Sequence, residues 1–186
     1  QMFSIVWKGK RCMRYFSIYA DKRHIQPHIL NRELLISPHI QQQELIYEEL
    51  DQRNHLKVEL EQEVEFMDIV NSPIFMVTKE FANLIRIYRP AIKFKYMVLF
   101  DEKNRRTASY QIPSLQVIDC LHKNSELSRD GNTITKGILR GEKTENAPIF
   151  RLKGSRGSYI MANLAFVESA FRREVRGMGI EEFVVQ

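Results

Sequence analysis

The chain has 186 residues, of which 44% are hydrophobic and 27% charged, so it is long enough to bury a sizeable core. This composition excludes a disordered chain and a collagen-like repeat, and two cysteines are too few for a disulfide framework. Apolar runs fall far short of the roughly 20 residues that cross a membrane. We therefore expect a soluble protein of a reducing compartment.

The formal net charge of +5 is distributed unevenly along the chain. Residues 1–40 carry 7 basic and 2 acidic side chains, residues 41–70 carry 2 and 9, and residues 71–186 carry 19 and 12. The protein is therefore basic with one acidic segment. This division weakens the usual inference that a basic protein binds nucleic acid.

The first expected element in chain order is a strand over residues 14–19, which are rich in aromatic and β-branched side chains. We treat residues 1–12 as an N-terminal extension. Within it, Gln1 precedes Met2, and we expect it to remain from a purification tag.

The next stretch is interrupted by prolines and cannot form one long helix. Periodicity leaves residues 31–36 open between a helical turn and a short strand. Residues 41–51 combine good helix formers with an apolar side, which predicts a short amphipathic helix.

Residues 56–66 alternate between apolar and mostly acidic side chains, the most specific physical pattern in the chain. Period two predicts a half-buried strand. A helix is the alternative, because apolar residues also recur every three to four positions, but it would place like charges four residues apart. On a strand, alternate residues lie about 6.6–7 Å apart, so one face would present a carboxylate row about 20 Å long. This row consists of Glu59, Glu61, Glu63 and Glu65.

The pattern after Pro73 predicts a strand over residues 74–77 and a helix that Thr78 caps and Pro90 ends. Strands over residues 92–101 and 107–112 follow as a hairpin, whose turn lacks glycine and should therefore be longer than two residues. An apolar stretch over 115–121 and a strand around 134–139 come next.

The pattern recurs near the C-terminus, where residues 148–152 match residues 73–77. An extra strand over 159–161, a helix over 163–176 and a strand over 180–185 follow, with Gly177 as a left-handed cap. Strands outnumber helices, which predicts a single α+β domain over residues 13–186. We expect a mixed or mostly antiparallel sheet with few helices and a duplicated strand–helix–strand unit.

Two groups of residues have the composition of chemical sites. His24 and His28 stand four apart, as two metal ligands on a helix do, but Pro27 disfavours that helix and no third ligand is apparent. The segment Asp119-Cys120-Leu121-His122 contains the residue types of thiol catalysis, although triad partners normally meet in space rather than in one tetrapeptide. We expect a surface loop and a buried cysteine instead.

The glycine-rich residues 154–158 could cradle a phosphate, but they lack the full phosphate-loop pattern and we expect a strand as the next element, so we favour a hairpin turn. We accordingly predict no catalytic residue, no metal ligand and no cofactor.

Two charged surfaces remain as binding candidates. The carboxylate row suits a basic partner by electrostatic complementarity, and its alternative is a solvated face neutralised by the protein's own cations. The hairpin offers cations for phosphates near Tyr96 and Tyr110 for stacking, although such lysines also keep an edge strand from pairing. These cations are Lys93, Lys95, Arg105 and Arg106.

Several short segments together resemble the immunity-protein family numbered eleven of bacterial polymorphic toxin systems, formerly a bacterial domain of unknown function. The resemblance starts at Met13-Arg14-Tyr15-Phe16 and is densest after residue 72. The later segments are Tyr110-Gln111-Ile112-Pro113, Ile118-Asp119-Cys120-Leu121 with Ser125, Ile149-Phe150-Arg151-Leu152, Gly179-Ile180 and Phe183-Val184-Val185.

This resemblance implies a cytoplasmic, non-enzymatic protein that binds and neutralises a cognate toxin domain. The carboxylate row Glu59 to Glu65 would then be the docking surface. The alternative from another class is a nucleic-acid-binding module that uses the basic hairpin. The resemblance supplies no catalytic residue, and we expect no membrane partner.

Overall fold

The computed structural model describes residues 13–30, 47–48, 50–61, 63–129, 131, 133–153 and 159–186. The expected extension over 1–12, the undecided element over 31–36, most of the expected helix over 41–51 and the glycine-rich turn over 154–158 lie outside these residues.

One six-stranded sheet, here the first sheet, contains the N-terminal and C-terminal strands of the described chain. Its members are β1 (Tyr15–Ala20), β8 (Val117–Ile118), β11 (Ile138–Leu139), β12 (Ile149–Leu152), β13 (Tyr159–Asn163) and β14 (Met178–Val185). They lie in the order β11-β14-β1-β13-β12-β8. The expected strand over 134–139 is split at Gly137 into β11 and a separate strand, β10 (Ile134–Lys136).

A second six-stranded sheet comes from the first two thirds of the chain. Its members are β2 (His28–Ile29), β3 (Arg53–Glu59), β4 (Ile69–Val70), β5 (Met76–Val77), β6 (Phe94–Asp101) and β7 (Arg106–Pro113), in the order β2-β3-β6-β7-β5-β4. A small two-stranded sheet pairs β9 (Glu126–Leu127) with β10, and a 3-10 turn, η2, spans Gly141–Lys143.

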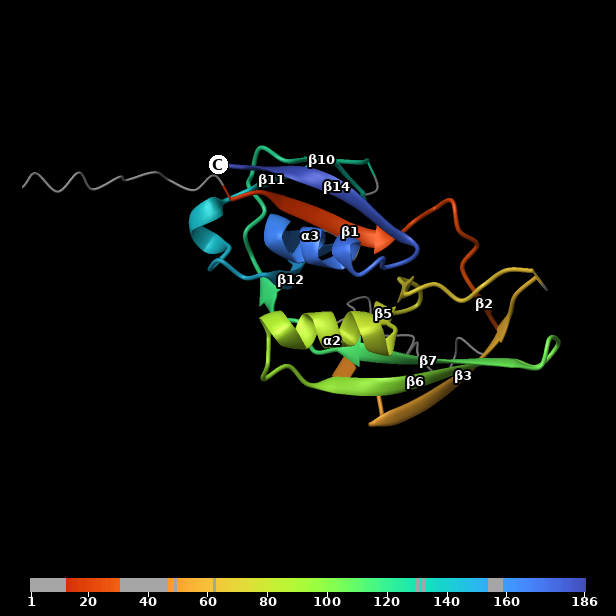
Figure 1. Ribbon diagram of the computed structural model, residues 1–186. Helices are drawn as coiled ribbons and strands as arrows, with labels where there is room; N and C mark the ends of the chain where they lie inside the picture. Colours follow the sequence, from red (N-terminus) through yellow and green to blue (C-terminus); the bar gives the residue numbers. More distant parts are fainter. Residues whose placement is uncertain are drawn as a thin grey trace, which may run out of the picture.

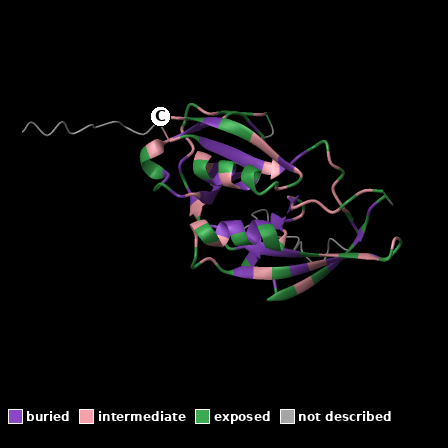
Figure 2. Ribbon diagram, viewed as in Figure 1, coloured by how far each residue is buried: buried purple, intermediate pink, exposed green. Residues whose placement is uncertain are grey.

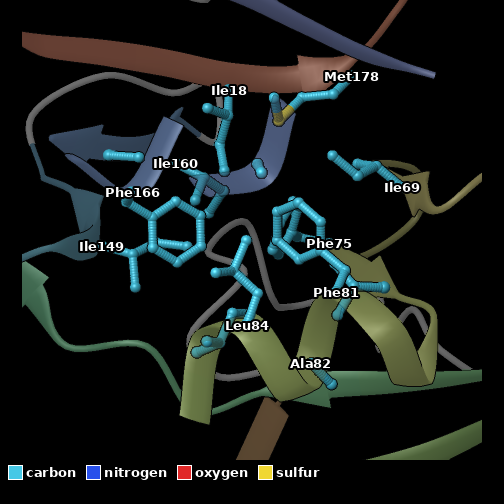
Figure 3. Close-up of a cluster of buried hydrophobic side chains, with 14 of the residues drawn as sticks. Ile18, Ile69, Phe75, Phe81, Ala82, Leu84, Ile149, Ile160, Phe166 and Met178 are labelled. Atoms are coloured by element: carbon cyan, nitrogen blue, oxygen red, sulfur yellow. The ribbon is translucent and has the colours of Figure 1, made fainter. Parts of the chain in front are cut away.

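Two helices lie between the two sheets, α2 (Lys79–Tyr88) and α3 (Leu164–Arg172), as Figure 1 shows. The Tyr88 hydroxyl of α2 donates to the Ala165 carbonyl of α3 over 2.9 Å, and the Phe81 and Phe166 rings meet edge-on at 5.8 Å between centroids. The surrounding core takes apolar side chains from both helices and both sheets (Figure 3). With few helices and mixed sheets, the α+β class is confirmed.

The outer face of each sheet buries a smaller apolar cluster. Leu56, Met97 and Tyr110 of the second sheet pack beneath Tyr47 and Leu50. Phe150, Met161 and Phe183 of the first sheet pack with residues of the 118–147 region. Figure 2 shows the consequence: β1 is buried along most of its length, whereas β3 and β6 alternate between buried and exposed residues.

Five adjacent strands have the same arrangement in both sheets. The order β3-β6-β7-β5-β4 in the second sheet corresponds to β11-β14-β1-β13-β12 in the first. In each, the first pair is parallel and the other neighbouring pairs are antiparallel. Helix α2 connects β5 to β6, and α3 connects β13 to β14, across the central strand. The duplicated strand–helix–strand unit is therefore present.

The predicted correspondence between the two units is wrong by one strand. The sequence pattern matches residues 148–152 with 73–77, but β12 occupies the position of β4, and β13 that of β5. The local similarity of two apolar segments after a proline does not specify which strand precedes the helix.

Helix boundaries follow local chemistry. Thr78 is the N-cap of α2 as predicted, although its hydroxyl donates to the Asp68 carboxylate rather than to the helix. Helix α3 ends at Arg172, four residues earlier than predicted, because Glu174 adopts a left-handed φ of 54°. Gly177 has the expected left-handed φ of 71°, but the C-cap of α3 is Arg173, so the prediction that Gly177 caps this helix is wrong. A Cβ at Gly177 would lie 2.7 Å from the Cβ of Met67.

Candidate binding surface

The alternating acidic segment is a strand only up to Glu59. Strand β3 runs parallel to β6 through the pair Val58–Asp101, and β6 then turns away into the hairpin. Beyond this point β3 has no partner on that side, so the chain leaves the sheet. The prediction of a strand over 56–66, and with it a straight carboxylate row about 20 Å long, is wrong beyond Glu59.

Residues 60–66, here called the acidic loop, are held by side chains of the β6–β7 hairpin. Asn104 donates to the Leu60 carbonyl over 2.7 Å. The Arg106 guanidinium donates to the carbonyls of Val64 (2.7 Å) and Glu61 (3.1 Å). These bonds satisfy backbone groups that a neighbouring strand would otherwise satisfy.

The end of the acidic loop is attached to the turn after α3. The Tyr110 hydroxyl donates to the Met67 carbonyl over 2.6 Å. Asp68 accepts from the Arg176 backbone N–H at 2.7 Å, and its own N–H donates to the Arg176 carbonyl at 3.2 Å. The described residues at both ends of the loop are thus anchored by hydrogen bonds.

The four predicted carboxylates have two different environments. Glu59 accepts from Lys103 at 2.8 Å, which lowers the pKa of Glu59, and Glu65 accepts from Arg176 at 2.7 Å. Glu61 and Glu63 are exposed, and no other described residue bonds their carboxylates. The protein's own cations therefore neutralise Glu59 and Glu65 and leave Glu61 and Glu63 available.

The four cations of the basic hairpin do not form one surface. Lys95 Nζ donates to the carbonyls of Tyr47, Glu48 (3.2 Å) and Leu50 (2.6 Å), and Arg106 holds the acidic loop. Lys93 and Arg105 remain exposed, and Arg105 lies in a four-residue turn with φ of 52°. The longer turn is confirmed.

Replacing Lys95 by methionine is expected to lower the free energy of unfolding by about 1–3 kcal/mol, because three backbone carbonyls lose a charged donor. Urea denaturation measures the change. The matched control is Lys93→Met, which removes the same charge from an exposed position. Equal losses for the two variants would contradict the structural role of Lys95.

The Asp119-Cys120-Leu121-His122 segment does not have the geometry of a thiol catalytic site. Burial raises the pKa of Cys120 to about 11, so its thiol is protonated at neutral pH. The Asp119 carboxylate accepts from Arg140 at 3.0 Å, and His122 Nδ1 accepts from the Asn124 backbone N–H at 3.1 Å. Neither bond orients an imidazole toward the thiol.

The histidine pair is separated by structure as well. His28 begins β2 opposite Glu59, while His24 lies in the turn after β1. The described part of the chain contains no group of three or more His, Cys, Asp or Glu side chains placed to hold a metal ion.

The sequence did not indicate the contacts that several residues make to shape this surface. Tyr110 bonds Met67, and Arg176 bonds Asp68, over separations of more than 40 and more than 100 positions in the sequence. A local sequence pattern cannot predict contacts between residues so far apart. Asn104 is the exception, because an Asp followed three residues later by Asn is typical of a turn. The backbone N–H of Asn104 donates to the Asp101 carboxylate at 3.3 Å.

Comparison of the chain with protein-family models and with curated proteins finds no match. None of the helices in the described ranges is long and apolar enough to cross a membrane.

Proposed function

We propose that this protein is a non-enzymatic immunity protein, which binds and neutralises a cognate toxin domain in the cytoplasm. Its partner is a basic protein, such as a nuclease domain, that docks on the acidic loop. The resemblance to immunity-protein family eleven motivates the toxin partner. One observation carries the docking surface: a loop anchored at both ends presents two carboxylates that bond no other residue in the described part of the chain, those of Glu61 and Glu63.

A loop anchored at both ends suits tight binding because less conformational entropy is lost when the partner arrives. Exposed carboxylates also accelerate the encounter with a basic surface, and this effect decreases with salt. Glu65 extends the anionic area, since its side chain is 68% exposed even in its ion pair with Arg176. The pair is weak enough for a partner cation to share the carboxylate.

Charge reversal at the loop should remove protection against the toxin. The test takes the C-terminal domain of the protein that the neighbouring gene encodes, which is the proposed toxin, and expresses it in cells that carry this protein. Wild type is expected to restore growth, and Glu61→Lys/Glu63→Lys is not, because repulsion replaces two attractions. The measurement is colony survival, with protein levels checked by immunoblot.

The control is Glu142→Lys/Glu181→Lys, which makes the same change in net charge at two exposed glutamates outside the loop. It is expected to protect like wild type. Full protection by the loop variant would exclude the acidic loop as the docking surface, and a neighbour without a toxin domain would remove the proposed partner.

A further inference from the structure

A second exposed surface lies on the helix-facing side of the second sheet, where α2 covers only one end. The Arg86 guanidinium of α2 lies 4.2 Å above the Phe94 ring and donates to Gln111 at 2.6 Å. Phe94 is consequently only 7% exposed, whereas Tyr96 and Phe100 further along β6 are 43% and 39% exposed. The helix thus leaves two aromatic rings of a central strand open to solvent.

The strand register places a basic side chain beside each exposed ring. Arg53 of β3 is paired with Tyr96, and Lys57 with Phe100. His55 lies between them, and its ring meets the Phe100 ring edge-on at 6.4 Å. We call Arg53, His55, Lys57, Tyr96 and Phe100 the aromatic–basic face.

The other side of the face is lined by hydroxyl groups. On β7, Thr107 is paired with Phe100, and Ser109 with Val98, and both are exposed. Rings therefore occupy the middle strand, with cations on one side and hydrogen-bonding groups on the other. Tyr96 and Phe100 are four residues apart on β6, about 13–14 Å on a strand, so each ring can stack on a separate base of an extended single strand.

Electrostatics favour an anionic occupant. Among the described strand residues of this face, the one acidic side chain is Glu59, and Lys103 neutralises it at 2.8 Å. Lys57 lies 2.8 Å from Glu102 of the turn, but both side chains are more than half exposed, so a phosphate can compete for this lysine. Arg53 and Arg86 add further positive charge.

We propose that the aromatic–basic face binds single-stranded nucleic acid, with bases stacked on Tyr96 and Phe100 and phosphates bound by Arg53 and Lys57. Stacking on exposed rings tolerates any base, so binding is not sequence-specific. This inference is independent of the proposed function, because it uses another surface. It also differs from the basic hairpin predicted from the sequence, whose Lys95 and Arg106 are engaged internally.

Fluorescence anisotropy tests the proposal with labelled oligouridylate and oligothymidylate of about twelve nucleotides, a length within the range of stacking sites. Both single strands are expected to bind, and comparing them shows whether RNA or DNA is preferred. Tyr96→Ala and Phe100→Ala should each weaken binding about tenfold. Tyr96→Phe should retain binding, because it keeps the ring.

Salt dependence provides an independent readout. Arg53→Ala removes one phosphate contact and should reduce the slope of log affinity against log salt by about 0.7. The matched control is Phe171→Ala/Arg172→Ala, an exposed ring and cation on α3, which should bind like wild type. Glu61→Lys/Glu63→Lys should not weaken binding.

Four results would overturn the proposal. The first three are no binding at low salt, an affinity for the oligouridylate–oligoadenylate duplex equal to that for the single strands, and a loss of affinity in the α3 control equal to that in the Tyr96 and Phe100 variants. A fourth is a concentration-dependent dimer in sedimentation that Tyr96→Ala/Phe100→Ala abolishes without changing oligonucleotide affinity. That result would assign the face to a second copy of the chain.

Discussion

Phe166→Ala is expected to lower the free energy of unfolding by about 3–5 kcal/mol, the largest effect of any single substitution considered. Phe166 is fully buried between the two sheets, and its ring contacts Phe81 at 5.8 Å and Tyr88 at 5.2 Å between centroids. Truncation removes these contacts and leaves a cavity in the core that joins both sheets (Figure 3). Denaturant unfolding followed by circular dichroism gives the value.

The matched control for Phe166 lies on the same helix. Phe171 of α3 is 51% exposed, so Phe171→Ala should change stability by no more than about 0.5 kcal/mol. A loss below about 1 kcal/mol for Phe166→Ala would mean that the two helices do not share one tightly packed core.

Arg106→Met is expected to cost about 2–4 kcal/mol, because it removes one partner of a buried ion pair and two donors to the acidic loop. The Asp101 side chain is fully buried, and Arg106 donates to it at 2.9 Å. Arg105→Ala removes the same charge from the adjacent exposed position and is expected to be nearly neutral. Hydrogen exchange should also accelerate at the loop amides of the Arg106 variant alone.

The stability lost in Arg106→Met should depend on pH, because the ion pair requires an ionised Asp101. Burial tends to raise the pKa of Asp101, but hydrogen bonds from Asn104 and Arg106 outweigh it, so the pKa is lowered. The stabilisation is present above the ordinary carboxyl pKa, about 3.9, and is lost as pH falls through the lower folded value. The difference in free energy of unfolding between wild type and Arg106→Met should therefore stay constant from pH 7 down to about pH 4 and narrow as the pH falls further. A difference that stays constant below about pH 4 would mean that the ion pair contributes nothing.

Local patterns predicted the elements whose partners lie close in sequence. The hairpin of β6 and β7 is joined by a short turn, and α2 is bounded by Thr78 and Pro90, so residue types alone locate them. The end of β3 at Glu59 is different. Alternation continues to residue 66, but a strand also needs a hydrogen-bonding neighbour, and β6 stops supplying one at Asp101. That limit depends on pairing between distant segments.

The candidate site was predicted in composition but not in geometry. The sequence presents the acidic segment and the basic hairpin as competing surfaces, yet Asn104 and Arg106 bind the backbone of the acidic loop. Contacts between residues more than 40 positions apart in the sequence decide which charges remain exposed. The sequence could therefore identify Glu61 and Glu63 as candidates, but it could not separate them from Glu59 and Glu65.

The most direct test of the account is the dissociation constant of the purified protein and the toxin domain of its neighbouring gene, measured by calorimetry at several salt concentrations. Glu61→Lys/Glu63→Lys should weaken binding about 100-fold or more and reduce its salt dependence. Glu142→Lys/Glu181→Lys should leave the constant unchanged. Tight binding by the loop variant, with wild-type salt dependence, would contradict a docking surface on the acidic loop.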